Sequence, residues 1–411
     1  MSEKIALPKL RFSEFKDSGA ISLENGNVIF EPINNKKHNS DLPVLAIFQE
    51  HGAIPREQID YNVSVSEKSL KSYKVVQVGD FIISLRSFEG GIEYSTWHGI
   101  CSPAYLILRK KRKIVEQYYK YYFKTDKFIK DLNKDLEGIR DGKMVNYSQF
   151  SSILIPLPSN EEQQKIADCL SSLDDLIAAE NDKLEALKTH KKGLMQKLYP
   201  AEEQAVPEWR FPEFRDSGEW TKLPISQFGD IVTGNTPKTS DGDNYGGDIM
   251  FVTPADISGA REVTKSNTTL TPKGYSKTRK IPARSVLFVC IGSTIGKVAQ
   301  NKYDCATNQQ INAIVPFGGF ISNFIYYALE TAHRRIAQLA GKQAVPIINK
   351  TLFSSVVLSA PKNEKEQKKI ANCLSAIDDK ITAQAEKIEA LKQHKRGLMQ
   401  GLFPSAQEVM K

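Results

Sequence analysis

The sequence predicts an α+β protein in which two mixed α/β domains are held apart by two long antiparallel coiled-coil helices, with a pseudo-twofold internal duplication. Three observations predict it: a repeated helical segment, a heptad pattern within each copy, and β-rich segments between the copies. EALKTHKKGLMQ occupies residues 185–196, and EALKQHKRGLMQ occupies residues 389–400, 204 residues later. Because solenoid repeats recur every ~20–50 residues, a period this long indicates a duplicated domain-sized unit.

The duplication covers both ends of each half and leaves the middle different. EEQQKIADCLSSLDDLI (161–177) aligns with EKEQKKIANCLSAIDDKI (364–381) at the same offset, and PKLRFSEFKDSG (8–19) aligns with PEWRFPEFRDSG (207–218) at an offset of 199. Each half therefore consists of a short arm, a long variable block and a helix. The expected boundaries are 1–158 for the N-terminal domain, 159–200 for the central helix, 201–361 for the C-terminal domain, and 362–411 for the distal helix and tail.

The repeated segment has the pattern of a coiled-coil helix. Ser159 and Asn363 are expected to cap the two helices, and Glu162 and Glu366, three residues on, to complete two capping boxes. Apolar residues then recur in steps of four and three at Ile166, Leu170, Leu173, Ile177, Leu184, Leu187, Leu194 and Leu198, and at Ile370, Leu374, Ile377, Ile381, Ile388, Leu391, Leu398 and Leu402. A 3.5-residue period over about five heptads is typical of a coiled-coil seam. About 38 residues at ~1.5 Å each would form a rod of ~57 Å.

An alternative is that these are two ordinary amphipathic helices, each of which covers its own domain. The narrow apolar stripe argues against it, because an ordinary surface helix needs a wider one. Polar residues also interrupt the two seams at matching positions, Glu180 and Lys191 in the first copy and Gln384 and Lys395 in the second. Matching interruptions favour pairing of the two copies with each other, antiparallel and in one register.

Each variable block is expected to form a compact mixed domain that ends in a helix. The β-rich runs lie at 74–87 and 102–110 in the first block and at 248–257, 285–292 and 310–317 in the second. The expected helices lie near Val115–Lys134 and at 322–340. Loops rich in Lys, Asn, Gln, Thr, Tyr and Gly separate the runs of the second block, and such side chains pair with base edges and phosphates.

The positive charge of the chain is concentrated in the two variable blocks. The net charge is +8; residues 20–157 carry 19 basic and 16 acidic residues, and residues 219–360 carry 15 and 9. This excess fits a nucleic-acid partner. No run approaches the ~18 apolar residues of a membrane span, and the first residues lack the pattern of a signal peptide. A cytoplasmic protein is therefore expected.

The sequence offers no convincing catalytic or metal-binding motif. GSTIGKV (292–298) has one residue too few between its glycines for a phosphate-binding loop and lacks a Ser or Thr after Lys297, so a tight turn is expected there. SPAY (102–105) lacks the second proline of the amino-methyltransferase motif. Five cysteines without a C-x-x-C pair are expected to be buried free thiols, and six histidines show no metal-ligand spacing. We expect no catalytic residue, no metal site and no cofactor in this chain.

The duplicated helix resembles that of the specificity (S) subunits of type I restriction–modification enzymes. The resemblance rests on PSNEEQQKIADCLSSLDDLI…EALKTHKKGLMQKLYP and its second copy, NEKEQKKIANCLSAIDDKI…EALKQHKRGLMQGLFP. It extends to RFPEF (210–214), VTGNTP (232–237) and ATNQQINAI (306–314). It covers essentially the whole chain, and the first block carries fewer of these signatures than the second.

The resemblance implies that the two blocks are target recognition domains, each reading one half of a bipartite, asymmetric sequence of double-stranded DNA. The paired helices would be the spacer between them and would dock two methyltransferase (M) subunits, and through these the restriction (R) subunits. S-adenosylmethionine, ATP and Mg²⁺ would be bound by those partners. Alternatives are a coiled-coil scaffold without intrinsic DNA specificity, which the basic blocks argue against, and a stand-alone modification enzyme or nuclease, which the missing catalytic motifs argue against.

The candidate DNA-binding residues are polar or basic residues on the loops of both blocks. They are Arg86, Ser87, Arg140 and Lys143 in the first block, and Lys238, Tyr245, Lys273, Lys297, Asn308, Gln309, Gln310, Lys342 and Gln343 in the second.

Overall fold

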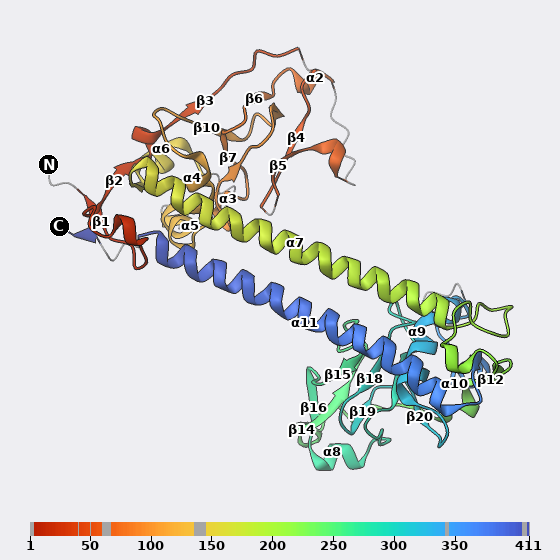
Figure 1. Cartoon of the computed structure of the whole chain (residues 1–411). Coiled ribbons are helices and arrows are strands. Elements are labelled where there is room, and N and C mark those ends of the chain that lie inside the picture. The colour runs from red at the N-terminus through yellow and green to blue at the C-terminus, as the bar shows by residue number, and fades with distance from the viewer. Residues whose placement is uncertain are drawn as a thin grey trace. The chain divides into compact units, whose positions relative to one another are not determined.

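The protein consists of two compact units, each of which contains one variable block and parts of both long helices. The computed structural model describes residues 4–39, 41–49, 51–59, 67–134, 145–341, 345–404 and 409–410. Unit 1 comprises Met1–Glu180 and Lys387–Lys411, and unit 2 comprises Asn181–Glu386. The boundaries between units thus lie within the long helices α7 (Asn160–Leu198) and α11 (Glu364–Leu402), rather than at their ends (Figure 1).

The first block is a mixed domain of short strands and helices. Its strands and those of its flanking segments are β1 (Ile5–Ala6), β2 (Ile21–Asn25), β3 (Phe30–Ile33), β4 (Leu45–Phe48), β5 (Gly52–Pro55), β6 (Lys74–Val76), β7 (Phe81–Ile83), β8 (Glu93–Tyr94), β9 (Gly99–Cys101), β10 (Leu106–Lys110), β11 (Leu154–Leu157) and β22 (Val409–Met410). Its helices are α1 (Gly26–Ile29), α2 (Glu67–Leu70), α3 (Ser87–Gly90), α4 (Glu116–Tyr122), α5 (Asp126–Asn133) and α6 (Tyr147–Ser152).

The second block has longer strands and a longer terminal helix. Its strands are β12 (Thr221–Pro224), β13 (Gly229–Thr233), β14 (Tyr245–Val252), β15 (Glu262–Val263), β16 (Thr268–Leu270), β17 (Val286–Val289), β18 (Val298–Asn301), β19 (Cys305–Thr307), β20 (Ile311–Pro316) and β21 (Val357–Ala360). Its helices are α8 (Pro272–Ser276), α9 (Ser322–Gln338) and α10 (Lys350–Ser355).

The two blocks share one strand arrangement, although their sequences show little similarity. The main sheet runs β3-β10-β7-β8 in unit 1 and β13-β20-β17-β18-β15 in unit 2, and the four strands common to both are antiparallel. The antiparallel pair β2–β11 likewise matches β12–β21. Beside the main sheet, Val44 bridges Ile100 of β9 in parallel, as Met250 of β14 pairs in parallel with Cys305 of β19. The duplication therefore includes the framework of the blocks.

Most of the predicted elements are present, and one helix is not continuous. The runs at 248–257, 285–292 and 310–317 contain residues of β14, β17 and β20, and α9 confirms the predicted helix of the second block. The single helix expected near Val115–Lys134 is wrong: α4 ends at Tyr122, and α5 starts after Thr125, whose hydroxyl accepts a hydrogen bond from the Phe128 N–H at 3.3 Å. The predicted turn between β17 and β18 is confirmed, with Gly292 and Gly296 at φ 97° and 95°.

In each unit the two long helices are joined by the same ionic contact. In unit 1, Lys395 of α11 binds Asp174 of α7, and that carboxylate also accepts a hydrogen bond from the Tyr121 hydroxyl at 2.8 Å. In unit 2, Lys191 of α7 binds Asp378 of α11 at 2.9 Å, and Asp378 accepts from the Tyr327 hydroxyl at 2.6 Å. The start of each helix meets the end of the other, so the pairing is antiparallel. The lysines that interrupt the apolar seam are thus the partners of the repeated aspartates.

The seam residues face inward along both helices. Eight are buried: Ile166, Leu170, Leu198, Ile370, Leu374, Ile377, Ile388 and Leu402. Eight are half-buried: Leu173, Ile177, Leu184, Leu187, Leu194, Ile381, Leu391 and Leu398. The outer ones join the domain cores; Ile166 and Leu402 lie in one core with Tyr118, and Leu198 and Ile370 lie in another with Phe324. Each helix end therefore covers a domain, while the middle of the seam faces the other helix.

Ser159 and Asn363 cap the two helices as predicted, but the capping boxes are wrong: only Ser159 accepts from the third residue of its helix, and neither glutamate turns back toward its cap. The Ser159 hydroxyl accepts a hydrogen bond from the Glu162 N–H at 3.2 Å, and the Asn363 side chain accepts one from the Lys365 N–H at 2.9 Å. The carboxylates of Glu162 and Glu366, however, are held by arginines of the repeated arms rather than turned back toward the caps. The local sequence around each cap does not indicate this contact, because the arginines that bind the glutamates lie in arms that are distant in the sequence.

Each arm grips the start of a long helix through a set of contacts that we call the arm clamp. Arg11 donates two hydrogen bonds to Glu162, both at 2.7 Å, and the two side chains are 9% and 2% exposed. Arg210 does the same to Glu366 at 2.7 and 2.8 Å, with the side chains 9% and 0% exposed. The next residues repeat as well, because Lys165 lies over Phe12 and Lys369 lies over Phe211.

Replacing Arg210 by alanine should lower the free energy of unfolding of unit 2 by about 3–5 kcal/mol, because the Glu366 carboxylate would stay buried without its cation. Chemical denaturation would measure the change. The matched control is Arg215→Ala, an exposed arginine on the same arm, which should alter stability by less than about 0.5 kcal/mol. Equal effects of the two substitutions would show that the arm clamp does not stabilise unit 2.

Unit 1 holds a buried carboxyl group whose protonation depends on pH near neutrality. Glu93 of β8 pairs with Lys124, and its side chain is 3% exposed. Burial raises the pKa of Glu93 to about 7, and burial lowers the pKa of Lys124. The folded carboxyl therefore keeps a proton at pH values where the unfolded one, with an ordinary pKa of 4.5, has released it.

The stability of unit 1 should consequently fall as the pH rises from about 4.5 to about 7, since the unfolded state binds fewer protons in this window. Glu93→Gln should remove a pH-dependent contribution on the order of 1–3 kcal/mol. Denaturant titrations across this range would measure it, with the exposed Glu89→Gln as the control. A Glu93→Gln variant with the same pH slope as the parent would contradict the assignment.

Candidate nucleic-acid interface

Three loops of unit 2 are tied together at one end of the second block. They are the β13–β14 loop, the α8 segment and the β19–β20 loop. The Asn235 side chain donates to the Lys277 carbonyl at 3.0 Å and accepts from the Arg279 N–H at 2.8 Å. The Thr236 hydroxyl donates to the Gln309 side chain at 2.8 Å. Side chains that lie far apart in the sequence thus share one preorganised surface, which we call the unit 2 loop surface.

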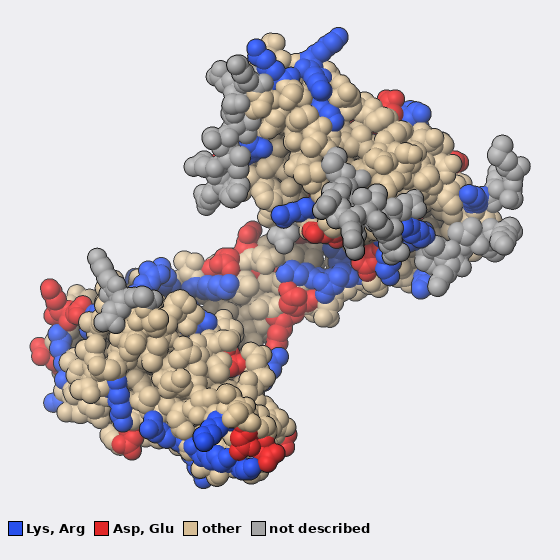
Figure 2. Space-filling view, turned by 180° about the vertical axis from the view of Figure 1, so that it is seen from behind, with Lys and Arg blue, Asp and Glu red and all other residues tan. Residues whose placement is uncertain are grey.

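Exposed cations line the unit 2 loop surface and alternate with carboxylates. Lys273 binds Asp243 at 2.8 Å and Lys277 binds Asp241 at 3.0 Å. The hydrogen bond from Lys277 lowers the pKa of Asp241, and the hydrogen bond to Asp243 raises the pKa of Lys273. Figure 2 shows Lys and Arg side chains together with acidic ones at this end of the block. Exposed ion pairs of this kind contribute little stability, so a phosphate can replace the carboxylates at low cost.

The predicted polar readers of the second block lie on this surface. Gln309 is exposed, while Asn308 donates to the Gln310 side chain at 2.8 Å, and both of these are half-buried. Lys238 is exposed. The Tyr245 hydroxyl donates to the Pro237 carbonyl at 2.8 Å, which shapes the loop. An exposed carboxamide on a fixed loop, such as that of Gln309, can form the two hydrogen bonds that adenine offers in the major groove once it exchanges its bond to Thr236 for the base.

Three other predicted residues, Lys297, Arg86 and Ser87, lie outside the unit 2 loop surface. Lys297 donates to the carbonyls of Pro254 and Ile257, at 3.3 and 2.8 Å, and lines a hollow beside α9. In unit 1, Arg86 is exposed, whereas Ser87 is 1% exposed and its hydroxyl accepts from the Ser84 N–H. Burial leaves Ser87 no surface for a base in this conformation. Four predicted residues lie outside the described residues: Arg140, Lys143, Lys342 and Gln343.

The shared strand arrangement identifies the matching loops of unit 1, which sequence reasoning missed. The β3–β4 loop of unit 1 corresponds to the β13–β14 loop, and the β9–β10 loop corresponds to the β19–β20 loop. These unit 1 loops carry the exposed Lys36 and Lys37 and the half-buried Tyr105. The Lys74 ammonium donates to the Tyr105 carbonyl at 2.7 Å, and Asn35 accepts from the Lys37 N–H at 2.9 Å. The double lysine in NNKKHN was the available signal.

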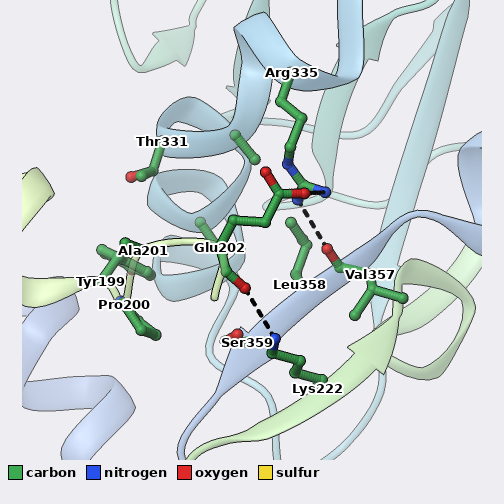
Figure 3. A pocket seen from close by; sticks show the side chains of 12 residues that line it. Tyr199, Pro200, Ala201, Glu202, Lys222, Thr331, Arg335, Val357, Leu358 and Ser359 are labelled. Atoms are coloured by element: carbon green, nitrogen blue, oxygen red, sulfur yellow. Dashed lines mark hydrogen bonds and ion pairs between the residues drawn. The ribbon is translucent and has the colours of Figure 1, made fainter. Parts of the chain in front are cut away.

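One hollow of unit 2 is lined by charged groups that already bond to one another or to the backbone. It measures about 540 Å³ and lies between the end of α7, α9 and β21. Figure 3 shows that its charged groups are already engaged: Arg335 binds Glu202 at 3.2 Å and the Val357 carbonyl at 3.0 Å, and Lys222 donates to the Glu202 carbonyl at 2.9 Å. These bonds fasten the segment after α7 to the second block.

Within the described residues, no group of three or more His, Cys, Asp or Glu side chains could hold a metal ion. The five cysteines are unpaired, as predicted, but the expected burial is wrong for Cys169 and Cys373, which are half-buried. Cys101, Cys290 and Cys305 are buried, and burial raises their pKa to about 12. A thiol with so high a pKa is a poor nucleophile at neutral pH. Across the same part of the chain, none of the helices combines the length and the apolar character that a membrane span requires.

Comparison with known proteins identifies the family. The model of the type I restriction modification DNA specificity domain matches residues 12–189 and again residues 217–393. The chain belongs to the type I specificity subunits. A Methanocaldococcus jannaschii protein provisionally named the MjaX type I restriction enzyme specificity subunit is 26% identical over 361 residues, which are 83% of this chain and 81% of the relative. The HindI specificity subunit of Haemophilus influenzae is 31% identical over 150 residues, 35% and 32% of the two chains.

The fold agrees with this membership. The crystal structure of a type I restriction–modification S subunit from M. genitalium has a TM-score of 0.57 at 14% identity and covers 97% of this chain and 99% of that one. The two matches to one domain model each cover one variable block and most of the long helix that follows it, α7 in the first match and α11 in the second.

On the unit 2 loop surface, substitution of a residue that contacts a base should differ in effect from substitution of a residue that contacts a phosphate. Gln309→Ala should relax specificity at one base position, at a cost of about 1–3 kcal/mol against the correct base. Lys238→Ala should weaken binding to all sequences alike and reduce the salt dependence by about one counterion. Competition binding across salt concentrations would measure both, with Lys302→Ala, at the other end of β19, as the control. If neither variant differed from Lys302→Ala, the surface would not be the DNA contact.

Proposed function

We propose that this specificity subunit reads a bipartite, asymmetric sequence in double-stranded DNA, with one half read by each block. The proposal rests on one observation: the arms and the long helices occur in two similar copies, whereas the loops of the two blocks differ. The arm clamp and the Lys–Asp–Tyr contact recur in both units. The loops on equivalent strand ends carry different side chains, so each block offers a different surface to DNA.

The repeated arms and long helices indicate a partner that binds in two copies. Two identical subunits arranged about a pseudo-twofold axis need two equivalent surfaces, and the repeated arms and helices supply them. We assign this partner as the methyltransferase (M) subunit, through which restriction (R) subunits join the complex. The paired long helices then act as the spacer that sets the number of unread base pairs between the two half-sites.

This division of labour assigns the chemistry to the partners. The charged groups described in the hollow beside α7 are engaged in structural bonds, and the buried thiols are protonated at neutral pH. In the proposal, S-adenosylmethionine is bound by the methyltransferase subunits, and ATP and Mg²⁺ are bound by the partners as well. This chain supplies recognition and position, and it is not an enzyme by itself.

In unit 1 the reading surface is proposed to lie on the β3–β4 and β9–β10 loops. Lys36 and Lys37 would bind phosphates, since they are exposed and lie on the loop that matches the β13–β14 loop of unit 2. The Arg86 loop follows β7, whose counterpart β17 leads into the Lys297 turn. Equivalent strand ends therefore favour the double lysine over Arg86 as the main contact.

Exchange of one block tests the proposal. Residues 20–157 would be replaced by the corresponding block of a related specificity subunit with a different target, and methylation sites would be sequenced in cells that also express the methyltransferase subunit. One half of the methylated sequence should change, and the other half should stay, because the arms, the long helices and the second block are untouched. Exchange of residues 219–360 is the reciprocal control. A chimera in which both halves change would contradict the model of two independent readers.

A further inference from the structure

The two arms expose apolar side chains at equivalent positions. Leu7 and Leu10 are 41% and 46% exposed, and Val206 and Trp209, which lie 199 residues later, are 42% and 40% exposed; Leu7 and Val206 come directly before the aligned segments 8–19 and 207–218 and are counted with the arms. Isolated apolar residues on a surface are common and require no explanation. A pair with the same spacing, on the same repeated segment and exposed in both units, is a repeated feature of the surface.

The apolar pairs sit on backbone that is held in place on both sides. The Leu10 N–H donates to the Gly401 carbonyl at 2.9 Å, and the Trp209 N–H donates to the Lys197 carbonyl at 2.9 Å. Gly401 and Lys197 are equivalent positions in the last turns of the two long helices. The arm clamp fixes the next residue, Arg11 or Arg210, to the start of the other helix. Each pair is therefore presented rigidly, which lowers the entropy lost on binding.

Charge does not repeat between the arms, whereas the apolar pair does. Residues 203–218 contain four acidic and two basic residues, while the equivalent residues 4–19 contain two acidic and four basic residues. An acidic arm repels the phosphates of DNA, so nucleic acid does not fit both surfaces. Apolar burial is the contribution common to both arms. A partner that binds both must recognise it through an apolar pocket of its own.

We propose that the apolar pairs Leu7/Leu10 and Val206/Trp209 are the anchor points of two copies of one partner protein. The partner is the methyltransferase subunit, an assignment that rests on the proposed function. The duplication supports it, because two identical partners require the same apolar feature in each unit. The anchors lie on the arms, so the long helices alone do not define the docking surface.

The test measures how many methyltransferase subunits bind the full chain. Wild type, Leu7→Glu/Leu10→Glu, Val206→Glu/Trp209→Glu and the fourfold variant would each be mixed with the purified subunit and weighed by native mass spectrometry. The wild type should bind two copies, each double variant one, and the fourfold variant none. Loss of such an anchor should weaken its site at least about 30-fold, which titration calorimetry would measure.

Matched variants separate docking from folding. Tyr303→Glu changes an equally exposed apolar residue of unit 2 outside the arms, 54% exposed, and should still bind two copies. Thermal melting would show that each variant is folded, and the milder Val206→Ser/Trp209→Ser replaces any variant that is not. Loss of one copy in this milder variant supports the anchor as well.

Three outcomes would overturn the assignment of the anchors, and a fourth would contradict the proposed function on which it rests. Arm variants that bind two copies with unchanged affinity would exclude the anchors while leaving the proposed function intact. A Tyr303→Glu chain that binds one copy would place the docking surface elsewhere. A wild-type chain that is itself a dimer, and that becomes a monomer when the arms are altered, would identify a second copy of this chain as the occupant. A wild-type chain that binds no methyltransferase subunit would contradict the proposed function itself.

Discussion

The antiparallel contact between two copies of one helix is the constraint on which the rest of the structure depends. An apolar seam alone permits a slip by one heptad, because every heptad presents similar side chains. The lysines at the interrupted seam positions remove this freedom. Lys191 is 13% exposed and needs the Asp378 carboxylate, and Lys395 needs Asp174 in the same way. A slipped register would separate both lysines from these aspartates, and Lys395 would lose its carboxylate, whereas Lys191 also binds Glu330 of α9 at 3.0 Å.

The arms and the domain cores follow from this register. The start of each long helix receives an arginine from an arm, and its end supplies a carbonyl to an arm, so each unit closes around one start and one end. The outer seam residues then enter the core of the block, as Ile166 and Leu402 do in unit 1. Buried ion pairs contribute little net stability compared with apolar packing. Their role here is to specify which surfaces meet.

Sequence periodicity predicted the repeated parts well, because a heptad pattern depends only on neighbours along one helix. It predicted the long helices, their antiparallel pairing and the caps at Ser159 and Asn363. It failed where distant residues compete for a local group. The Glu162 carboxylate suits a capping box, but Arg11, 151 residues away, binds it instead. Similarly, the apolar pattern around Val115–Lys134 does not reveal that Thr125 starts a new helix.

The reading surfaces were less predictable, for a physical reason. A strand requires only alternating or continuous apolar residues, so two blocks can share one strand order without recognisable sequence similarity. The β19–β20 loop of unit 2 is predictable as a reading loop because Asn308, Gln309 and Gln310 adjoin one another in the sequence. Lys277, Arg279 and Asn235 form part of the same surface only after folding. In unit 1, the polarity of Ser87 suggests a contact to DNA, but its hydroxyl accepts a hydrogen bond from the Ser84 N–H within the loop.

We conclude that the duplicated arms and long helices hold two blocks that recognise different DNA sequences. Methylation-site sequencing tests it most directly, in a host that contains the partner subunits with and without this chain. We expect one methylated motif in two unlike parts, separated by a fixed number of unread base pairs and lost when the chain is deleted. An uninterrupted motif, two identical half-sites, or methylation that survives the deletion would contradict it.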